Sequence, residues 1–341
     1  MSTDIFGIGI ETSCDETGIA LIKNGNQIIA NPLFSQIKTH MLYGGVVPEM
    51  ASRLHLEKFP SMLEDLMKYR EFREVSYIAV TVQPGLIGSL LIGYHIALAL
   101  KKVLNVPLIP IHHLEAHLYA SQLTGKILEY PFLGLLLSGG NSAIYRVDGL
   151  GNLSLLGDTL DDACGEAFDK AAAMLHLPYP GGPEIEKQAY RFAQQNVHGK
   201  ISNPLPVLLR DQPKNKYQFS YSGLKTALYY FLQNNPSYDV NFICWCFQER
   251  AFEIVEKNIK NAIENTGIRK LSAAGGVMAN QNLKKRLSLL AEKNKFEFIT
   301  PCRELCTDNG AMIGALGFLY YQDKPEYDYQ NVISSKPVFN S

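Results

Sequence analysis

The first 130 residues alternate short apolar runs with polar turns, in the spacing that strands and helices produce. A polar segment, 12–18, separates the first two apolar runs, which predicts a β-hairpin with a polar tip. Pro48 begins an amphipathic pattern that ends at Leu66, and a second helix, rich in small residues, contains Gly88 and Gly93. Strands are expected over residues 5–11, 19–22, 27–34, 77–82 and 108–111.

The second half begins in the same way. An apolar run over 132–137 leads into the turn Ser138-Gly139-Gly140, and residues 143–147 are expected to form the second strand of another hairpin. A strand over 271–274 is followed by two glycines and a helix start. Five further helices are expected. One ends at residue 175, the next contains Glu184 and Glu186, and a third begins within 219–226. The last two span 240–264 and 307–321.

Composition limits the class of protein. A chain of 341 residues exceeds one ordinary hydrophobic core, so two domains or lobes are expected. Hydrophobic residues make up 46% and charged residues 19%, which is typical of a folded globular protein. The six cysteines have neither zinc-ribbon nor disulfide-framework spacing, which favours a reducing cytoplasm. No secretory signal is visible, and no apolar stretch is expected to be long enough to span a membrane.

The formal net charge of -1 bears on nucleic-acid binding. A protein that holds nucleic acid alone usually has a basic surplus, because phosphate contacts dominate its affinity. A nucleic-acid substrate would therefore need a local basic patch or a partner. The irregular stretch 198–217, which contains Lys200, Arg210, Lys214 and Lys216, is a candidate basic loop.

A pair of histidines follows the apolar run 108–111. His113 and His117 stand at i and i+4, so a helix places both rings on one face, where they can share an ion, whereas His112 points elsewhere. The alternative is that both are ordinary helix-face residues. Glu115 lies two residues after His113, so the glutamate placement of a HExxH metalloprotease is absent.

A metal site would need a third ligand. Asp308 is the best candidate, although an acid before a helix can simply stabilise the helix N-terminus. The first hairpin tip also gathers Glu11, Asp15 and Glu16 beside hydroxyls, as a solvated turn or as a cation or phosphate site.

Glycine turns are the second chemical feature. Successive glycines at 139–140 can leave backbone N–H groups free for an anion, although ordinary hairpin turns use the same residues. The strand–glycine–helix junction at Gly275 and Gly276 suits a nucleotide, because missing side chains admit a base or ribose.

Taken together, two hairpin-led halves fit the two-lobed fold of actin, Hsp70 and the sugar kinases (the ASKHA fold), with nucleotide and metal expected between the lobes. The chain also resembles the bacterial TsaD family of tRNA N6-adenosine threonylcarbamoyltransferases, formerly called O-sialoglycoprotein endopeptidases. Ten segments carry the resemblance in order: ETSCDETGIA, YGGVVPEMASRLH, PGLIGSLLIG, HHLEAHL, LLLSGGN, DDACGEAFDKAA, PGGPEIEK, FSYSGLKTA, AAGGVMAN and CTDNGAMIG.

The resemblance implies a site made of three groups of residues. One iron or zinc ion per subunit is expected on His113, His117 and Asp308. Asp15 and Glu16 are candidates for a general base or for substrate positioning. Threonylcarbamoyl-adenylate is expected to contact Leu136, Leu137, Ser138, Gly139, Gly140, Asp169, Gly182, Glu186 and Asn280.

Three positions depart from relatives. Archaeal and eukaryotic relatives have a tyrosine ligand where this chain has Leu136, so that metal bond is not expected. Asn141 replaces a histidine of many bacterial members and is shared with archaeal-type members. Glu186 stands where bacterial members often carry Asp, so the ligand-binding role of that position is carried over to a side chain that is one methylene longer.

The implied reaction moves the threonylcarbamoyl group from the adenylate to N6 of adenosine 37, in tRNAs that read codons beginning with A, and releases AMP. The implied partners are tRNA, a TsaB-type inactive paralogue, a TsaE-type P-loop ATPase and an upstream threonylcarbamoyl-adenylate synthase, with no membrane. The alternatives are a metalloendopeptidase, a small-molecule kinase of the same fold, or a scaffold without catalysis. The expected domains are 1–130, on which 307–341 packs, and 131–306, which carries the glycine turns.

Overall fold

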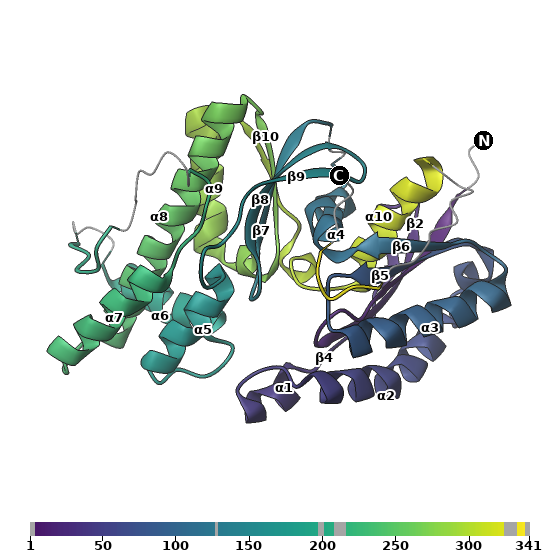
Figure 1. Cartoon of the computed structure of the whole chain (residues 1–341), viewed down its shortest axis with the longest axis horizontal. Coiled ribbons are helices and arrows are strands. Elements are labelled where there is room, and N and C mark those ends of the chain that lie inside the picture. Colours follow the sequence, from purple (N-terminus) through teal and green to yellow (C-terminus); the bar gives the residue numbers. More distant parts are fainter. Residues whose placement is uncertain (1–3, 127–128, 197–200, 208–215, 324–332, 338–341) are drawn as a thin grey trace. The chain divides into compact units, whose positions relative to one another are not determined.

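The computed structural model describes residues 4–126, 129–196, 201–207, 216–323 and 333–337. The chain forms two compact units (Figure 1). Unit 1 comprises Met1–Tyr130, Asp148–Leu153 and Thr300–Ser341, and unit 2 comprises Pro131–Val147 and Ser154–Ile299.

Unit 1 contains a sheet in the order β3-β2-β1-β5-β6, with β4 also paired to β2. Its strands are β1 (Phe6–Glu11), β2 (Glu16–Lys23), β3 (Gln27–Ala30), β4 (Leu33–Ser35), β5 (Val75–Gln83) and β6 (Leu108–His112). The predicted hairpin is confirmed as the antiparallel pair β1–β2, and β5 and β6 run parallel to β1. A single strand over 27–34 is wrong: it divides at Asn31 and Pro32, because proline has no N–H to continue the ladder.

Helices cover both faces of this sheet (Figure 1). They are α1 (Ile37–His40), α2 (Pro48–Leu66), α3 (Ile87–Leu104), α4 (His113–Tyr119) and α10 (Gly310–Asp323). Alternate residues of a strand point to opposite faces. Ile8 and Ile10 therefore join Phe59 of α2 in one buried cluster, whereas Ala20 and Ile22 pack against Ala311 and other residues of α10 in another.

The start of α10 lies directly on the hairpin because glycines allow the backbones to touch. A Cβ added to Gly9 would lie 2.1 Å from the carbonyl oxygen of Gly310, and a Cβ added to Gly18 would lie 2.7 Å from the backbone nitrogen of Gly310. No side chain fits at such distances, so this approach requires glycine. It fixes the segment that precedes α10, including Asp308, beside β1 and β2.

Helix α3 corrects the expectation about apolar stretches. Its 18 residues are long and apolar enough to cross a membrane, judged by length and composition alone. It packs against α2 and β5 through one face that includes the buried residues Leu90, Ala97 and Leu100, and 28% of the helix is buried.

Unit 2 repeats the strand order of unit 1. Its sheet runs β11-β10-β7-β8-β9, with an antiparallel β7–β8 hairpin and with β10 and β11 parallel to β7. The strands are β7 (Phe132–Leu137), β8 (Ser142–Gly149), β9 (Asn152–Gly157), β10 (Lys270–Ala274) and β11 (Glu297–Ile299). The helices are α5 (Cys164–Met174), α6 (Gly181–Gln195), α7 (Ser222–Asn234), α8 (Val240–Thr266) and α9 (Gln281–Asn294). The prediction that both halves begin with a hairpin is confirmed, whereas β9 and β11 were not expected.

Candidate functional site

The paired histidines lie at the start of a short helix that β6 delivers. His112 ends β6, and its Nδ1 accepts a hydrogen bond from Glu115 N at 3.4 Å, so this residue caps α4. His113 is the first residue of α4, and His117 follows one turn later. The centroids of these two rings are 4.7 Å apart.

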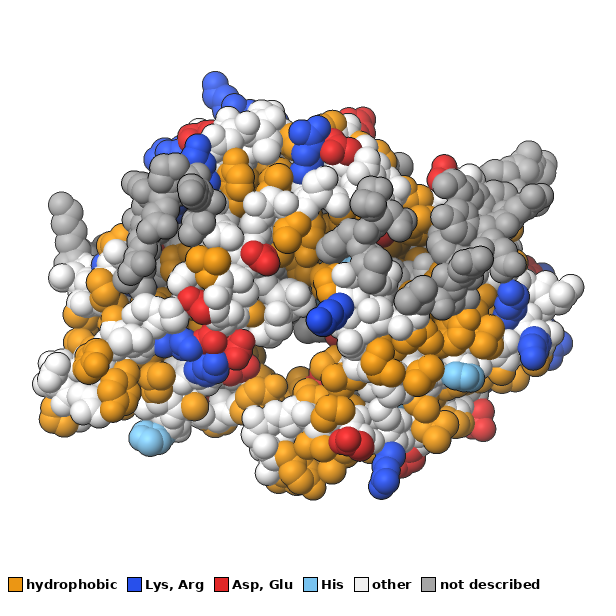
Figure 2. Space-filling model, viewed as in Figure 1, with side chains coloured by type: hydrophobic (Ala, Val, Ile, Leu, Met, Phe, Trp, Pro, Cys, Tyr) orange, Lys and Arg blue, Asp and Glu red, His pale blue; other side chains and the backbone are white. Residues whose placement is uncertain are grey.

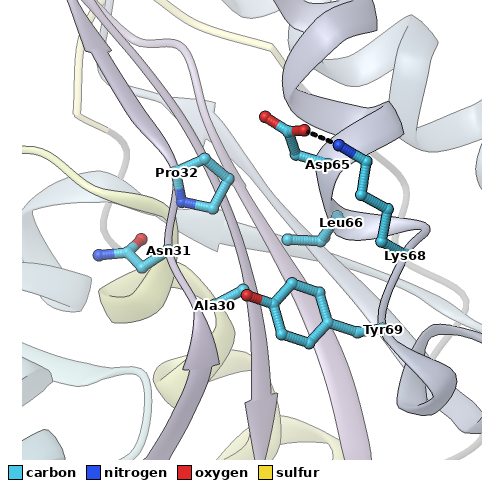
Figure 3. Close-up of a pocket in the computed structure, with 7 residues that line it drawn as sticks. All are labelled: Ala30, Asn31, Pro32, Asp65, Leu66, Lys68 and Tyr69. Carbon is cyan, nitrogen blue, oxygen red and sulfur yellow. Dashed lines mark hydrogen bonds and ion pairs between the residues drawn. The ribbon is translucent and has the colours of Figure 1, made fainter.

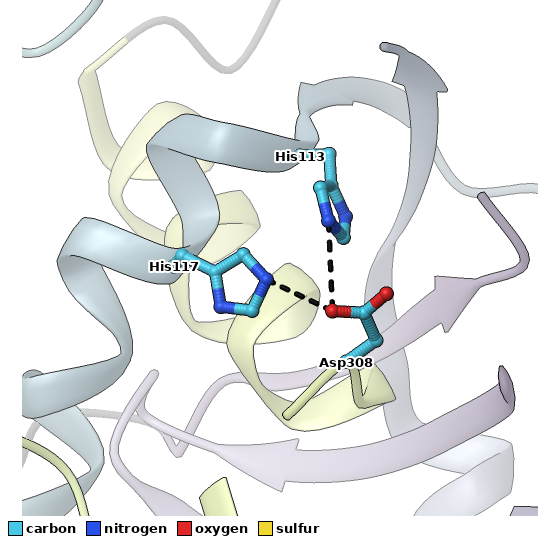
Figure 4. A group of neighbouring side chains, drawn as sticks. All are labelled: His113, His117 and Asp308. Carbon is cyan, nitrogen blue, oxygen red and sulfur yellow. Dashed lines mark hydrogen bonds and ion pairs between the residues drawn. The ribbon is translucent and has the colours of Figure 1, made fainter. Parts of the chain in front are cut away.

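Asp308 meets both rings from the segment before α10 (Figure 4). Its Oδ1 lies 2.9 Å from His117 Nε2 and 3.6 Å from His113 Nε2. One donor atom from each of the three residues lies within 4.8 Å of the others, so the group can hold a metal ion. The structure therefore brings together the three residues that the sequence suggested, and it leaves His112 outside the group.

The chemistry of this cluster fits a divalent transition metal. Two imidazole nitrogens and a carboxylate oxygen suit either iron or zinc. His117 Nδ1 is buried without a hydrogen-bond partner among the described residues, while its Nε2 faces Asp308. Burial would raise the pKa of Asp308, but His113 and His117 hold it down at about 2, so the ligand oxygen is ionised.

Negative charge accumulates around the cluster. Burial, reinforced by the carboxylates of Asp308 and Asp15, raises the pKa of Glu16 to about 10. Burial alone would lower the pKa of His113, yet Glu11 and Asp308 raise it to about 9. Both shifts show a site that favours added positive charge, as a cation provides.

The hairpin tip holds Asp15 and Glu16 near this cluster. Both side chains are partly buried, and Ser35 Oγ donates to Glu16 Oε1 at 3.3 Å. The effect of Asp308 on the pKa of Glu16 shows that the tip and the cluster lie within electrostatic range. The assignment of a catalytic role to these two acids stays a prediction.

The sequence suggested Glu11 only as part of a possible cation or phosphate site at the hairpin tip, and it did not relate this residue to His113. The side chain of Glu11 is 0% exposed, and its Oε2 lies 3.0 Å from His113 Nδ1. The feature of the sequence that could have indicated such a contact is the position of Glu11, a charged residue at the end of an apolar strand. Glu115, in contrast, accepts hydrogen bonds from Gly151 N and Tyr320 Oη, both at 2.9 Å. Its carboxylate is therefore committed elsewhere, which speaks against a metalloendopeptidase.

The predicted substrate-binding residues of unit 2 belong to elements joined in a closed ring of contacts. The turn after β7 contacts α5, because Gly165 N donates to Ser138 O at 3.1 Å. Asp169 of α5 accepts from Gly181 N at 2.6 Å, which joins α5 to α6. Glu186 of α6 accepts from Gln281 N at 2.7 Å, which joins α6 to α9.

The ring closes at the glycine junction after β10. Gly275 has a φ of +95°, and an added Cβ would lie 2.4 Å from the carbonyl oxygen of Leu137. Asn280 caps α9 by accepting from Leu283 N at 3.1 Å, and its amide donates to Gln248 Oε1 at 2.9 Å. Asp169, Glu186 and Asn280 thus hold helix starts in place. Their predicted contact with a ligand stays a prediction.

Three glycines of this ring have free space beside their backbone. A Cβ added at Gly139, Gly140 or Gly182 would meet nothing within 4 Å. Leu136 and Leu137 are 0% exposed, so their side chains belong to the core. Any ligand at this surface would meet backbone rather than the leucine side chains.

A hollow of about 500 Å³ lies elsewhere in unit 1 (Figure 3). It is lined by Ala30, Asn31, Pro32, Asp65, Leu66, Lys68 and Tyr69. Its two charged side chains, Asp65 and Lys68, pair with each other at 2.6 Å. None of the predicted site residues lines it, so the chemistry described above lies outside this hollow.

The candidate basic loop is only partly described. Lys200, Arg210 and Lys214 lie outside the described residues, whereas Lys216 is described and exposed. The prediction of a basic RNA-binding loop therefore stays open.

Comparison with known proteins gives consistent matches. Residues 27–315 match the family model TsaD, tRNA N6-adenosine threonylcarbamoyltransferase. A protein of that name from Leptospira interrogans (serovar copenhageni) is 47% identical over 333 residues, which cover 97% of this chain and 98% of the relative. One from Herminiimonas arsenicoxydans is 42% identical over 325 residues, covering 94% and 93%.

Solved structures of low sequence identity share the fold. Full-length HypF in its phosphate- and nucleotide-bound form superposes with a TM-score of 0.60 at 14% identity, covering 94% of this chain but only 56% of HypF. The activator of 2-hydroxyisocaproyl-CoA dehydratase from Clostridium difficile, with bound ADPNP, gives 0.52 at 15% identity, covering 96% and 99%. The prediction of an actin-like and Hsp70-like fold is confirmed.

Proposed function

Because this chain belongs to the TsaD family of tRNA N6-adenosine threonylcarbamoyltransferases, we propose that it transfers threonylcarbamoyl from threonylcarbamoyl-adenylate to N6 of adenosine 37 in tRNAs that read codons beginning with A. The chain is a transferase that modifies tRNA. The observation that carries the proposal is the match to this family over most of the chain, and the His113–His117–Asp308 cluster supports it.

The reaction forms one bond and breaks another. N6 of adenosine attacks the carbamoyl carbon, the bond from that carbon to the phosphate oxygen breaks, and AMP leaves with the electron pair. The proton released from N6 must go to a base. Asp15 and Glu16, at the tip of the first hairpin, are our candidates for this step. Burial raises the pKa of Glu16 to about 10, so this carboxyl already carries a proton near neutral pH and we assign it to positioning the substrate, whereas Asp15 is our candidate for receiving the proton.

An adenine amino group is a weak nucleophile because its lone pair is delocalised into the ring, so the acyl group must be activated. A bound metal ion would supply a Lewis acid at an oxygen of the substrate. His113, His117 and Asp308 would hold this ion; the two histidines are buried, whereas the Asp308 side chain is 21% exposed. Iron and zinc are both compatible with these ligands.

We assign the adenylate to the glycine turns of unit 2. Backbone N–H groups near Gly139, Gly140 and Gly182 would hold phosphate or ribose, because no side chain blocks them. Asp169, Glu186 and Asn280 would keep the surrounding helix starts in position. Such prearranged N–H donors would also stabilise the AMP that leaves.

The distribution of charge supports binding of tRNA by unit 2. This unit has 19 Lys and Arg against 15 Asp and Glu, whereas unit 1 has 13 against 18. Phosphate contacts dominate RNA affinity, so the positive unit is the more suitable surface. A surplus of four charges is modest, which is consistent with help from partners.

We propose the TsaB-type paralogue, the TsaE-type ATPase and a cytoplasmic adenylate synthase as those partners. Hydrophobic side chains are exposed in one part of unit 1 (Figure 2): Leu42 at 82% and Tyr43 at 60% lie in the turn between α1 and α2, and Leu56 at 58% lies on α2. Apolar residues gathered on a surface are typical of a protein interface. They support pairing with another protein on unit 1.

A reconstituted assay tests the proposed function. Carboxyl-labelled threonine, ATP and bicarbonate are supplied to the synthase, with this protein, the partners and an unmodified tRNA transcript. Label should enter tRNA only when all components are present, and replacing adenosine 37 with guanosine should prevent it. Transfer of label without this protein, or equal transfer to the guanosine transcript, would contradict the assignment.

A further inference from the structure

We propose that Glu11 is a positioning residue for the metal cluster, because its carboxylate fixes the protonation and orientation of the His113 ring. Glu11 ends the central strand β1, and its side chain is 0% exposed. A carboxylate at such a position is costly unless every oxygen is engaged. The contacts of the two carboxylate oxygens of Glu11 indicate its function.

Three groups hold this carboxylate in one orientation. Ser13 N donates to Oε1 at 2.6 Å, and Thr81 Oγ1 donates to Oε2 at 2.5 Å. His113 Nδ1 lies 3.0 Å from the same Oε2. The first two donors come from the hairpin tip and from β5, so the carboxylate is fixed independently of His113.

The fixed carboxylate determines which nitrogen of His113 can bind a metal. An ionised carboxylate only accepts hydrogen bonds, so Nδ1 must carry the proton that they share. Nε2 is then the nitrogen available to bind a metal ion, and it lies 3.6 Å from Asp308 Oδ1. A carboxylate behind a metal-binding histidine also makes the imidazole a better donor.

His117 has no such support. Its Nδ1 is buried without a partner among the described residues, although its Nε2 lies 2.9 Å from Asp308 Oδ1. Glu11 therefore acts on one of the two histidines. Together with Asp308 it also supplies two negative charges in a buried site, which balance a divalent cation and favour it over a monovalent one.

This inference rests on the metal-binding part of the proposed function, and metal affinity tests it without the transfer reaction. Co²⁺ and Zn²⁺ are titrated against a competing chelator in the full-length protein. Glu11→Gln should weaken binding about 10–100-fold and shift the visible absorption of bound Co²⁺. The matched control is Glu115→Gln, which removes an equally buried carboxylate from α4 and should change affinity less than about threefold.

Magnetic resonance of zinc-loaded protein with ¹⁵N-labelled histidine gives a second readout that requires no variant at position 11. His113 should show a protonated Nδ1 that exchanges slowly with water and an Nε2 that carries the metal. Binding through Nδ1 would overturn the proposal, as would equal affinity losses in the two glutamine variants or no metal binding by the unaltered chain. Failure of the transfer assay alone, with these metal results intact, would count against the proposed function and not against this role of Glu11.

Discussion

His117 Nε2 and Asp308 Oδ1 lie 2.9 Å apart, although 191 positions separate these residues in the sequence. The contact depends on glycine, because Gly9 and Gly310 let the start of α10 reach the hairpin that carries β1 and β2. Two of the proposed metal ligands are thus brought together by backbone packing at Gly310, which lies two residues after Asp308.

The first prediction concerns metal content. The purified protein should carry about one transition metal ion per chain, and His113→Ala, His117→Ala and Asp308→Ala should each reduce affinity by more than about 100-fold, beyond the usual effect of an outer-shell change. His112→Ala should retain the metal, because His112 caps α4 and lies outside the cluster. Elemental analysis and chelator competition measure both outcomes. Equal loss in the His112 variant would contradict the ligand assignment.

The second prediction separates two kinds of glycine. Gly139→Val should leave thermal unfolding unchanged and abolish binding of a non-hydrolysable adenylate analogue, because a Cβ at this position meets no protein atom within 4 Å and the side chain would occupy the proposed ligand surface. Gly275→Val should destabilise the fold by about 1–3 kcal/mol or more, since its φ is +95° and the Cβ would strike the carbonyl oxygen of Leu137. Calorimetry of unfolding and of binding distinguishes the two. Unchanged affinity in folded Gly139→Val would show that this turn is an ordinary hairpin.

Much of the fold could be predicted because it depends on local pattern. The hairpin at β1–β2 follows from alternation around a polar tip, and α2 begins at Pro48 and ends at Leu66 as expected. The division of the strand at Pro32 was missed, since a short apolar run does not show which backbone groups are paired. The strands β9 and β11 are short and mixed in polarity, which leaves little periodic signal.

The candidate site was predictable only in part. The spacing of His113 and His117 is local, but the approach of Asp308 depends on backbone contact between distant segments. Glu11 was suggested only as part of the hairpin tip; its contact with His113 could not be predicted, because the two residues are 102 positions apart in the sequence. Asp169 and Asn280 carried a predicted ligand role from resemblance, whereas pattern alone could not show that their side chains hold helix starts.

The third prediction uses the pH dependence of stability. Hydrogen bonds from Ser220, Tyr221 and Ser222 lower the pKa of Asp161, although burial opposes them. A folded pKa below the unfolded value means that the stabilisation is present above about pH 4 and is lost as pH falls through the folded pKa. Asp161→Asn should therefore cost about 1 kcal/mol at pH 7, as expected for an exposed carboxylate that accepts backbone and hydroxyl donors at the start of α7.

Denaturant unfolding from pH 7 down to pH 3 checks this prediction. The difference between Asp161→Asn and the unaltered protein should shrink as the pH falls. Glu166→Gln serves as the control, because Glu166 pairs with Lys170 on the surface and should contribute less than about 0.5 kcal/mol. A pH-independent difference for the Asp161 variant would show that packing, rather than the charge, carries the effect.

The last prediction concerns two adjacent basic residues of α9, which differ in their surroundings. Arg286 is held between two glutamates: its Nε and Nη2 donate to the carboxylate of Glu256 at 2.8 and 2.6 Å, and its Nη1 donates to Glu249. Its side chain is only 17% exposed. Lys285 is exposed on the same helix. The sequence does not distinguish these two neighbours. Their contacts predict that Arg286 contributes to stability and Lys285 to tRNA binding.

Arg286→Ala should lower the free energy of unfolding by about 2 kcal/mol, because it leaves two partly buried carboxylates without their cation, and it should leave the salt dependence of tRNA binding unchanged. Lys285→Ala should leave unfolding within about 0.5 kcal/mol and should reduce the slope of log affinity against log salt by roughly one unit, if unit 2 holds tRNA through this surface. Filter binding of tRNA over a salt series, with denaturant unfolding of each variant, measures both quantities. An unchanged slope for the Lys285 variant would show that this part of α9 makes no phosphate contact, and the tRNA would then be held by other residues of unit 2 or by a partner.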